Sequence, residues 1–447
     1  MDTKYFGTDG IRGIAGQFPV DGVFAQRLGI ALVRYLRQKK SGNLLLLGRD
    51  TRTSGPMLIK GLVGGITCES GDCLDAGVIT TPGLGFLTKE LGFDMGVMIS
   101  ASHNPYMYNG FKVFKSEGIK LTKEEELELE EFIEDVKESS FQGAKGAKTL
   151  VDGAERYEYF LKSTLRRPDT LNQFSVALDC ANGSTSHIAP KLFSELCRKT
   201  HFIFASPDGE NINKECGSEH PHGLAQIVRK GTFDMGFCFD GDGDRVIVID
   251  EKGQILSGEH LLYVLSKYLL LTESLTVPKL VTTIMSNSGL KVGLKRLGME
   301  IVETDVGDRN VCYRMMEVGA KIGGEESGHI ILFDHLKTGD GMLTALKFLE
   351  AVSYFGKHVS ELSQELEIFP KKMCNLKVPK KLPLSQIPQL LPTIGKNQSR
   401  LGDLGKIIVR YSGTEPLIRI MVEAQDVNLL GEIMDEIVEI LKPYTLP

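Results

Sequence analysis

Residues 44–76 begin with the apolar run LLLLG (44–48), continue through a loop and a helix that Ser54 and Pro56 would start, and end with DCLDA (72–76). An apolar run, a polar loop, an amphipathic helix and a second apolar run are typical of the strand–helix–strand unit of α/β proteins. The pattern returns twice, from VALD (176–179) to FIFA (202–205) and from VTTIM (281–285) to IVE (301–303). The sequence therefore predicts three similar α/β domains.

The C-terminal part of the chain has a different pattern. Residues 366–400 hold five of the 17 prolines, so we expect no long regular element there and the start of a fourth domain. Apolar alternation predicts strands at 406–410 and 417–423. A helix should follow, with one apolar face formed by Leu429, Ile433, Ile437 and Leu441.

These patterns predict an α/β fold for the 447 residues, with three similar α/β domains that have mixed sheets and a smaller C-terminal α+β domain around a central cleft. The predicted domains are 1–150, 151–254, 255–367 and 368–447. Within the first domain, Thr122 and Glu125 form the capping box of a helix. The acidic run 124–131 on that helix is expected to be a solvated face.

The composition restricts the partners and the location. Lysines and arginines number 52 against 58 acidic residues, so a net charge of −6 argues against binding to nucleic acid. No apolar run approaches the length of a membrane span, and the N-terminal residues lack the pattern of an export signal. The eight cysteines form no C-x-x-C pair, which favours reduced thiols. We expect a cytoplasmic protein without a membrane partner.

The run DGDGDR (240–245) places three carboxylates, Asp240, Asp242 and Asp244, at alternate positions separated by glycines. Like charges about 4 Å apart repel by about 4 kcal/mol at an effective dielectric constant near 20, so the run is expected to bind a cation. Carboxylate oxygens suit Mg²⁺.

The run has three other interpretations. An EF-hand would end at Glu251, but its sixth position is Arg245 instead of glycine, and the following residues have the pattern of a strand. Phosphotransferases of the haloacid-dehalogenase type share the start of the run, and in them Asp240 would be the nucleophile. A purely structural Asp/Gly turn is the third alternative.

Three further segments have side chains suited to phosphate or sugar. ISASHNPY (99–106) follows an apolar run, so Ser102, beside His103, would lie past a strand end and could carry a phosphoryl group. RYSGTEPLIR (410–419) has small residues and hydroxyls flanked by Arg410 and Arg419, as in a phosphate-binding loop. GGEESGH (323–329) offers Glu325, Ser327 and His329. Each segment could instead be an ordinary turn, and His329 could be structural.

Together the motifs resemble the signature set of the α-D-phosphohexomutase superfamily. They are, in chain order, GTDGIRG (7–13), SASHNP (100–105), DGDGDR (240–245), GEESGH (324–329) and RYSGTEP (410–416). With VGDR (306–309), they are most similar to the bacterial branch that acts on glucosamine phosphates. The resemblance spans the whole chain and implies interconversion of glucosamine 6-phosphate and glucosamine 1-phosphate, with glucosamine 1,6-bisphosphate as intermediate or activator.

The resemblance also implies roles for individual residues. Ser102 would be a phosphoserine, and its phosphate with Asp240, Asp242 and Asp244 would hold one Mg²⁺ per chain. The transferring phosphoryl group would be lined by Arg12, His103 and Lys112, with His329 as acid or base. The sugar phosphate would be bound by Asp308, Arg309, Glu325 and Ser327, and its non-reacting phosphate by Arg410, Ser412, Gly413, Thr414 and Arg419.

Three positions depart from the pattern of the superfamily. Asn310, Lys337 and Tyr411 stand where relatives often have tyrosine, a small hydroxyl residue and lysine. These differences bear on the exact sugar more than on the chemistry. The alternatives are a phosphomannomutase or phosphoglucomutase of the same superfamily and, in another class, a non-catalytic phosphosugar sensor. We also expect a homodimer.

Overall fold

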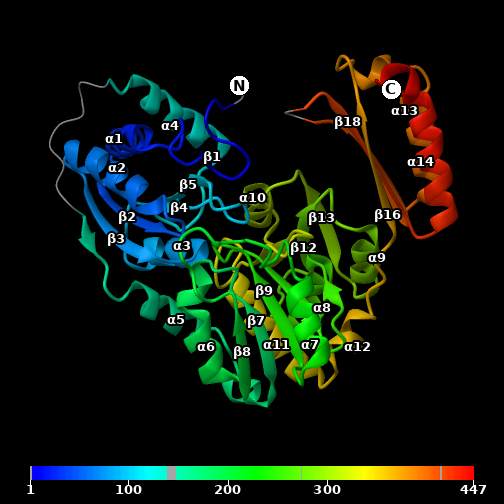
Figure 1. Cartoon of the computed structure of the whole chain (residues 1–447). Coiled ribbons are helices and arrows are strands. Elements are labelled where there is room, and N and C mark those ends of the chain that lie inside the picture. The colour runs from blue at the N-terminus through cyan, green and yellow to red at the C-terminus, as the bar shows by residue number, and fades with distance from the viewer. Residues whose placement is uncertain (1–2, 138–146, 273, 413–414, 447) are drawn as a thin grey trace. The chain divides into compact units, whose positions relative to one another are not determined.

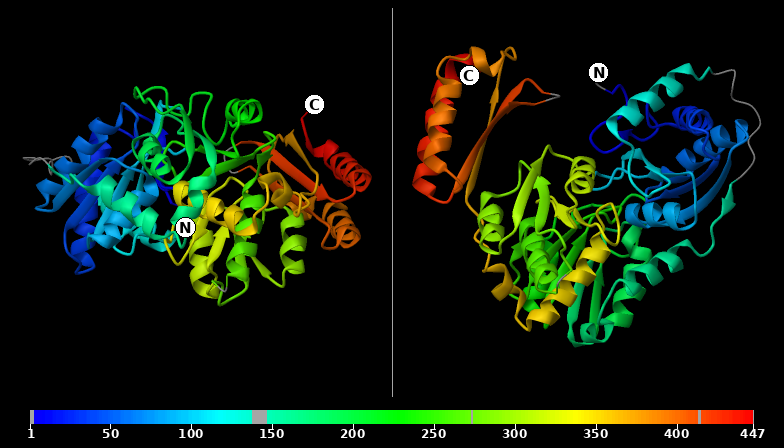
Figure 2. Two further views of the ribbon diagram at one scale, coloured as in Figure 1. Left: turned by 90° about the horizontal axis from the view of Figure 1, so that it is seen from below. Right: turned by 180° about the vertical axis from the view of Figure 1, so that it is seen from behind.

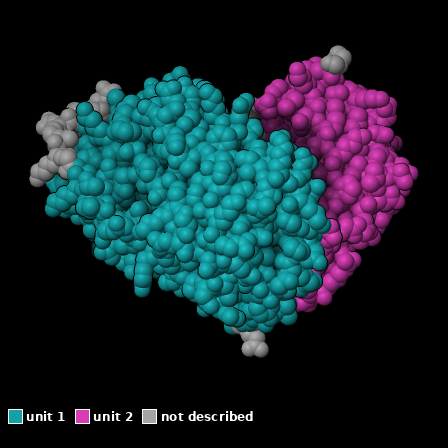
Figure 3. Space-filling view, turned by 60° about the horizontal axis from the view of Figure 1, so that its bottom comes forward, with its two compact units in different colours: residues 1–284, 302–363 teal, residues 285–301, 364–447 magenta. Residues whose placement is uncertain are grey.

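The computed structural model describes residues 3–137, 147–272, 274–412 and 415–446. These residues form two compact units (Figure 3). The larger unit comprises residues 1–284 and 302–363, and the smaller unit comprises 285–301 and 364–447. The boundaries between the four predicted domains remain a prediction, because this division into two units does not test them.

The first sheet of the larger unit has six strands in the order β1-β5-β4-β2-β3-β6 (Figure 1). β2, β3, β4 and β6 are parallel, whereas β5 runs antiparallel to both β4 and β1. The strands are β1 (Ile11–Ile14), β2 (Leu44–Arg49), β3 (Asp72–Val78), β4 (Met95–Ile99), β5 (Tyr108–Lys115) and β6 (Lys148–Thr149). The helices are α1 (Gly22–Gln38), α2 (Gly55–Cys68), α3 (Thr81–Glu90), α4 (Lys123–Asp135) and α5 (Gly153–Ser163).

The alternation of side chains along β2 explains how this sheet is covered. Leu45 and Leu47 are fully buried in one core with residues of α1, α2 and α4. Leu46 is equally buried but lies outside that core, as expected for a strand whose two faces are both covered.

The second sheet has five strands in the order β11-β10-β9-β7-β8. β7, β8 and β9 are parallel, and β10 turns back antiparallel to β9. The strands are β7 (Ser175–Asp179), β8 (Lys199–Ile203), β9 (Met235–Phe239), β10 (Val246–Asp250) and β11 (Ile255–Leu256), and the helices are α6 (Ala189–Leu196) and α7 (His222–Lys230). Strands flank the Asp/Gly run on both sides, which excludes the EF-hand interpretation.

The third sheet has four strands in the order β13-β12-β14-β15. They are β12 (Lys279–Thr283), β13 (Glu300–Thr304), β14 (Ile322–Gly324) and β15 (Ile330–Leu332). Helices of the larger unit in this part of the chain are α8 (Gly258–Leu271), α10 (Asp308–Val318), α11 (Gly341–Phe355) and α12 (Val359–Ser363).

The smaller unit contains an antiparallel sheet in the order β16-β18-β17. Its strands are β16 (Lys371–Lys377), β17 (Gly405–Tyr411) and β18 (Leu417–Ala424), and its helices are α9 (Ser288–Arg296), α13 (Leu390–Leu401) and α14 (Val427–Leu441). Figure 2 shows α13 and α14 against one face of this sheet. Ile433, Ile437 and Leu441 are buried there as predicted, and Leu429 packs at the edge of the same core. The predicted fold class, with three mixed α/β sheets and a smaller C-terminal α+β part, is confirmed.

Two expectations about individual elements were wrong. The proline-rich stretch does contain a regular element, the 12-residue helix α13. Pro392 is tolerated because it lies in the first turn of that helix, where backbone N–H groups have no partner within the helix.

The acidic run on α4 is not solvated throughout. The capping box of Thr122 and Glu125 is present as predicted, but Glu126 and Glu130 are buried. The Glu130 carboxylate accepts hydrogen bonds from the backbone N–H groups of residues 4, 5 and 6 at 2.8, 2.6 and 2.9 Å, and Glu126 pairs with Arg309. The two glutamates are four residues apart, so they share a helix face that turns toward the protein.

Among the described residues, no helix is long and apolar enough to span a membrane. In the same ranges, no disulfide joins any of the eight cysteines.

Candidate active site

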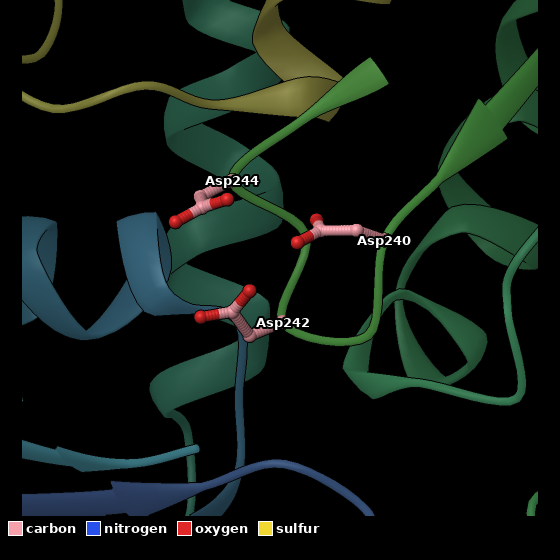
Figure 4. Close-up of side chains that lie close together, drawn as sticks. All are labelled: Asp240, Asp242 and Asp244. Atoms are coloured by element: carbon pink, nitrogen blue, oxygen red, sulfur yellow. The ribbon is translucent and has the colours of Figure 1, made fainter. Parts of the chain in front are cut away.

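The loop between β9 and β10 (residues 240–245), called the Asp loop, brings three carboxylates together. One oxygen from each of Asp240, Asp242 and Asp244 lies within 4.8 Å of the others, and all three side chains are buried (Figure 4). Gly243 has φ +74°, a left-handed conformation that glycine adopts without strain, and this conformation allows the tight curl of the loop. The convergence predicted from the sequence is therefore present.

The electrostatics of the loop favour a cation. Burial raises the pKa of Asp240 well above its usual range, and the negative charges of Asp244 and Asp242 raise it further. Oδ1 of Asp242 and Oδ1 of Asp244 are buried and accept no hydrogen bond from the described residues. Buried carboxylate oxygens are rarely left without a partner, and an ion that takes all-oxygen ligands fits them.

Ser102 lies beside this loop. It follows β4, is 1% exposed, and donates a hydrogen bond from Oγ to Oδ2 of Asp240 at 2.7 Å. Its Oγ is also 3.3 Å from Nδ1 of His103. The predicted phosphoryl carrier and the predicted metal ligands are thus adjacent, although Ser102 and Asp240 are 138 positions apart.

Lys112 on β5 supplies a positive charge to the same cluster. Its Nζ is 2.8 Å from Asp242, 3.2 Å from Asp244 and 3.0 Å from Asp9. Burial would lower the pKa of this amine, but the three carboxylates outweigh burial and raise it well above its usual range. Lys112 therefore carries a charge at neutral pH.

A second charged cluster adjoins the first. The Asp9 carboxylate contacts Lys112, Arg12 and Lys120, and Lys120 also pairs with Asp308. Burial would raise the pKa of Asp9, but Lys112, Lys120 and Arg12 together hold it well below its usual range. Asp9 and Lys120 belong to the site and were not predicted.

His329 lies between the two clusters. Its Nδ1 is 3.7 Å from Asp244 and its Nε2 is 3.8 Å from Asp308. Nε2 accepts a hydrogen bond from the backbone N–H of Gly339 at 3.0 Å, so in the neutral ring the proton resides on Nδ1 and faces Asp244.

The predicted sugar-binding residues lie in the same part of the larger unit. Oε1 of Glu325 accepts a hydrogen bond from the N–H of Gly307 at 3.1 Å. Oγ of Ser327 is buried and has no hydrogen-bond partner among the described residues. Arg309, also predicted to bind substrate, pairs with Glu126.

The predicted phosphate loop lies in the smaller unit. Arg410 and Arg419 are direct cross-strand partners on β17 and β18, an arrangement of like charges that is unfavourable without an anion. Ser412 is buried, its carbonyl accepts from Nζ of Lys381 at 2.6 Å, and Arg419 pairs with Glu415 at 3.0 Å. Gly413 and Thr414, also predicted here, lie outside the described residues.

Four other residues near Ser102 and Asp242 were missed. The Thr81 backbone N–H donates to the carbonyl of Asp242 at 2.8 Å, and its hydroxyl donates to the carboxylate of Asp242. The segment 100–105 that carries Ser102, called the serine loop, is surrounded by Asp50, Arg52 and Asn213. Asp50 and Arg52 come directly after the apolar run of β2, and that position at a strand end is the signal that could have identified them.

Comparisons with known proteins agree over the whole chain. Family models described as phosphoglucomutase/phosphomannomutase match as alpha/beta/alpha domain I at 3–140, domain II at 155–253, domain III at 257–369 and the C-terminal domain at 373–440.

Curated relatives carry a more specific name. The phosphoglucosamine mutase of Carboxydothermus hydrogenoformans is 42% identical over 443 residues, which cover 98% of this chain and 99% of the relative. The phosphoglucosamine mutase of Halalkalibacterium halodurans is 41% identical over 444 residues, with 98% of each chain covered.

Solved structures share the fold. A phosphoglucomutase/phosphomannomutase family protein from Burkholderia thailandensis superposes with a TM-score of 0.81 at 23% identity and covers 99% of this chain and 98% of its own. The N-acetylphosphoglucosamine mutase of Aspergillus fumigatus, solved in complex with GlcNAc-6P and magnesium, gives a TM-score of 0.68 at 16% identity, with 100% and 96% covered.

The geometry of the Asp loop predicts that Asp242→Asn weakens Mg²⁺ binding by at least about tenfold, because one of three converging charges is lost. Isothermal titration calorimetry with Mg²⁺ measures this affinity. The matched control is Asp234→Asn, which removes a carboxylate before β9, at the opposite end of the strand from Asp240. Equal affinity in Asp242→Asn and Asp234→Asn would remove the metal assignment.

Proposed function

Because this chain belongs to the phosphoglucomutase/phosphomannomutase family, we propose that it interconverts glucosamine 6-phosphate and glucosamine 1-phosphate. The reaction moves a phosphoryl group between two positions of one sugar, so the enzyme is an intramolecular phosphotransferase. We choose glucosamine as the sugar because the chain is about 40% identical, over nearly its full length, to several relatives named phosphoglucosamine mutase. Relatives named in this way also connect the activity to amino-sugar metabolism.

We propose that Ser102 carries the phosphoryl group as a phosphate ester. In the first step the bond between phosphorus and Oγ of Ser102 breaks while a free sugar hydroxyl bonds to phosphorus, which gives glucosamine 1,6-bisphosphate. The proton of that hydroxyl passes to a base, and Oγ of Ser102 takes up a proton as it leaves. His329 is the proposed base, and its Nε2 accepts the proton after releasing the N–H of Gly339. The sugar then turns end for end, and its other phosphoryl group returns to Ser102.

The proposed metal site consists of Asp240, Asp242, Asp244 and the phosphorylated Ser102, and the buried oxygens of Asp242 and Asp244 that accept no hydrogen bond support it. One Mg²⁺ per chain bound there would withdraw negative charge from the phosphoryl oxygens during transfer. Lys112 and Arg12 line the transferring group and offset the same charge. His103, 3.3 Å from Oγ of Ser102, is the other proposed neighbour of the phosphoryl group.

The proposed sugar contacts are Glu325, Ser327, Asp308 and Arg309. A buried serine hydroxyl without a partner, such as that of Ser327, is suited to a sugar hydroxyl. We propose that the loop 410–419, with Arg410, Ser412, Gly413, Thr414 and Arg419, holds the phosphate that does not react. A homodimer and a cytoplasmic location remain predictions.

The three departures from the superfamily pattern have structural partners in this chain. Nδ2 of Asn310 donates to the carbonyl of Val306 at 2.9 Å, Nζ of Lys337 lies 5.7 Å from the ring centre of Phe333, and Tyr411 packs against the core of the smaller unit. None of these contacts removes a charge or hydroxyl that the proposed chemistry uses. They therefore leave the proposed phosphoryl chemistry unchanged, and mannose and glucose phosphates stay the alternative substrates.

We expect a coupled mutase assay to show higher kcat/KM on glucosamine 6-phosphate than on mannose 6-phosphate or glucose 6-phosphate. Glucosamine has an amino group at C2 where mannose and glucose have a hydroxyl, so the site must distinguish the substituent at that carbon. Higher efficiency on the mannose substrate would transfer the chain to the phosphomannomutase alternative, and binding without turnover of any sugar would favour a sensor.

Ser102→Ala is expected to abolish turnover, because the ester can no longer form. Protein phosphorylated in its active form should keep its label in hydroxylamine, whereas an acyl phosphate on Asp240, the haloacid-dehalogenase alternative, is cleaved. Mass spectrometry of the peptide that contains Ser102 checks the position. A hydroxylamine-labile label in an active Ser102→Ala variant would overturn the serine mechanism.

Arg419→Ala should raise KM for both glucosamine 1-phosphate and glucosamine 6-phosphate, because whichever phosphate is not reacting would be bound by the loop 410–419. Loss of a charge-assisted hydrogen bond corresponds to about 1.5–3 kcal/mol. Arg400→Ala, an exposed arginine on α13 that pairs with Glu432, is the matched control and should leave both values unchanged. An effect on one isomer only would contradict the turning of the sugar.

A further inference from the structure

The loop that carries Ser102 has an unusual backbone. Ser102 has φ +52°, in the left-handed region that residues other than glycine seldom adopt. Such a conformation persists only where the surroundings hold it in place, and it is found at functional sites. The contacts that hold this serine are therefore part of the machinery.

Two side chains hold the same two carbonyl groups of the loop. Nη2 of Arg52 donates to the carbonyl oxygens of Ser102 and Asn104 at 2.9 and 2.8 Å. Nδ2 of Asn213 donates to these same oxygens at 2.8 and 2.9 Å. Nη1 of Arg52 adds a third carbonyl, that of Pro105, at 2.5 Å.

Arg52 is itself held by buried groups. Its side chain is fully buried, and its Nε donates to Oδ2 of Asp50 at 2.9 Å. The same oxygen accepts from Oγ of Ser100 at 2.6 Å, and Oγ of Ser100 accepts from the N–H of Ser102 at 2.9 Å. The contacts form a closed ring from Arg52 through Asp50 and Ser100 back to Ser102.

The Asp loop packs directly against these contacts. A Cβ atom added to Gly241 would lie 2.7 Å from the carbonyl oxygen of Ser102 and 2.8 Å from Nδ2 of Asn213. Only glycine fits at that position. The backbone of the Asp loop, the carbonyl of Ser102 and the amide of Asn213 are thus fixed against one another.

We propose that Arg52 and Asn213 form a carbonyl clamp that positions Ser102 for phosphoryl transfer. This inference rests on the proposed function. In the proposed mechanism, Oγ of Ser102 reacts with both ends of the sugar, so this oxygen must occupy the same position in both transfer steps. Reactions of this kind lose rate steeply when the reacting atoms are displaced, even by about 1 Å. Arg52 and Asn213 touch neither sugar nor phosphate in this scheme and act through Ser102.

The test uses two mild variants and one severe variant. Asn213→Gly removes the amide donors and, because Asn213 has φ +57°, adds no backbone strain. Arg52→Lys keeps the charge but has no planar fork that could reach three carbonyls. Arg52→Met removes the charge as well.

Asn397→Leu is the matched control. Asn397 is fully buried in the smaller unit, donates to Glu436 at 2.7 Å and accepts from Arg400 at 2.9 Å. Its loss removes a buried asparagine with a similar number of hydrogen bonds but touches no part of the serine loop.

The first measurement is the rate at which Ser102 gains a phosphoryl group when dephosphorylated enzyme is mixed with glucose 1,6-bisphosphate, followed by intact-protein mass spectrometry. The second is kcat and KM for glucosamine 6-phosphate. For Asn213→Gly we expect both the labelling rate and kcat to fall about 10- to 100-fold, with KM within about twofold. Arg52→Lys should retain more of both rates than Arg52→Met, and Asn397→Leu should keep both rates even where its Tm falls.

Wild-type labelling rates in Asn213→Gly and Arg52→Lys would overturn the clamp, and so would an equal loss of rate in Asn397→Leu. A separate outcome bears on the proposed function alone. If wild-type enzyme is labelled on Ser102 but does not isomerise glucosamine phosphates, the choice of substrate is wrong, and the labelling rates of the variants still decide whether the clamp exists.

Discussion

The burial of three carboxylates within 4.8 Å of one another is the constraint on which the rest of the site depends. Removing a charge from water costs several kcal/mol per ion unless a partner compensates it. Lys112 compensates Asp242 and Asp244, Asp9 and Lys120 extend the alternation of charge, and Lys120 reaches Asp308. A chain of alternating charges thus joins residues of the N-terminal loop, β5, the Asp loop and α10.

The topology explains why these residues can meet. β2 and β4 of the first sheet are parallel, and so are β7 and β9 of the second. Polar residues follow the carboxyl ends of three of these strands: Arg52 after β2, Ser102 after β4 and Asp240 after β9. The hydrogen bonds of Ser102 to Asp240 and of Asn213 to the serine loop show that the carboxyl edges of the two sheets face each other within the larger unit. Ligand sites of open α/β sheets occur at this edge.

The sequence allowed a large part of this to be predicted, because strand and helix patterns are local. The strand at 406–410 is β17, the helix after Thr122 is α4, and the three carboxylates of the Asp loop converge as their spacing suggested. The partners of those residues could not be predicted in the same way. Arg52 is 50 positions from Ser102, and Asn213 is 111 positions from it, so no local pattern announces either contact.

The two errors have the same origin. Glu126 and Glu130 look like part of a solvated acidic face until Arg309 and the backbone of residues 4–6 pack against them. Pro392 looks like an interruption until its place in the first turn of α13 is known. The burial of the two glutamates depends on tertiary contacts, and the tolerance of the proline depends on its position in the helix. Composition alone reveals neither.

Ser102 imposes opposite requirements on Asp240 in the two chemical states of the proposed cycle. The free hydroxyl is satisfied by donating a hydrogen bond to Asp240, as the structure shows. A phosphoserine has no such proton and carries a charge of about −1.5 to −2, so it would repel the same carboxylate. Lys112 already contacts Asp242 and Asp244, so its charge is shared with the Asp loop before a phosphate is present. A divalent cation held by the Asp loop would resolve this conflict, because it would attract both the carboxylate and the phosphate. In the proposed cycle, the fixed charge of Lys112 would therefore serve the Asp loop, and a metal ion would serve the charge that Ser102 gains and loses.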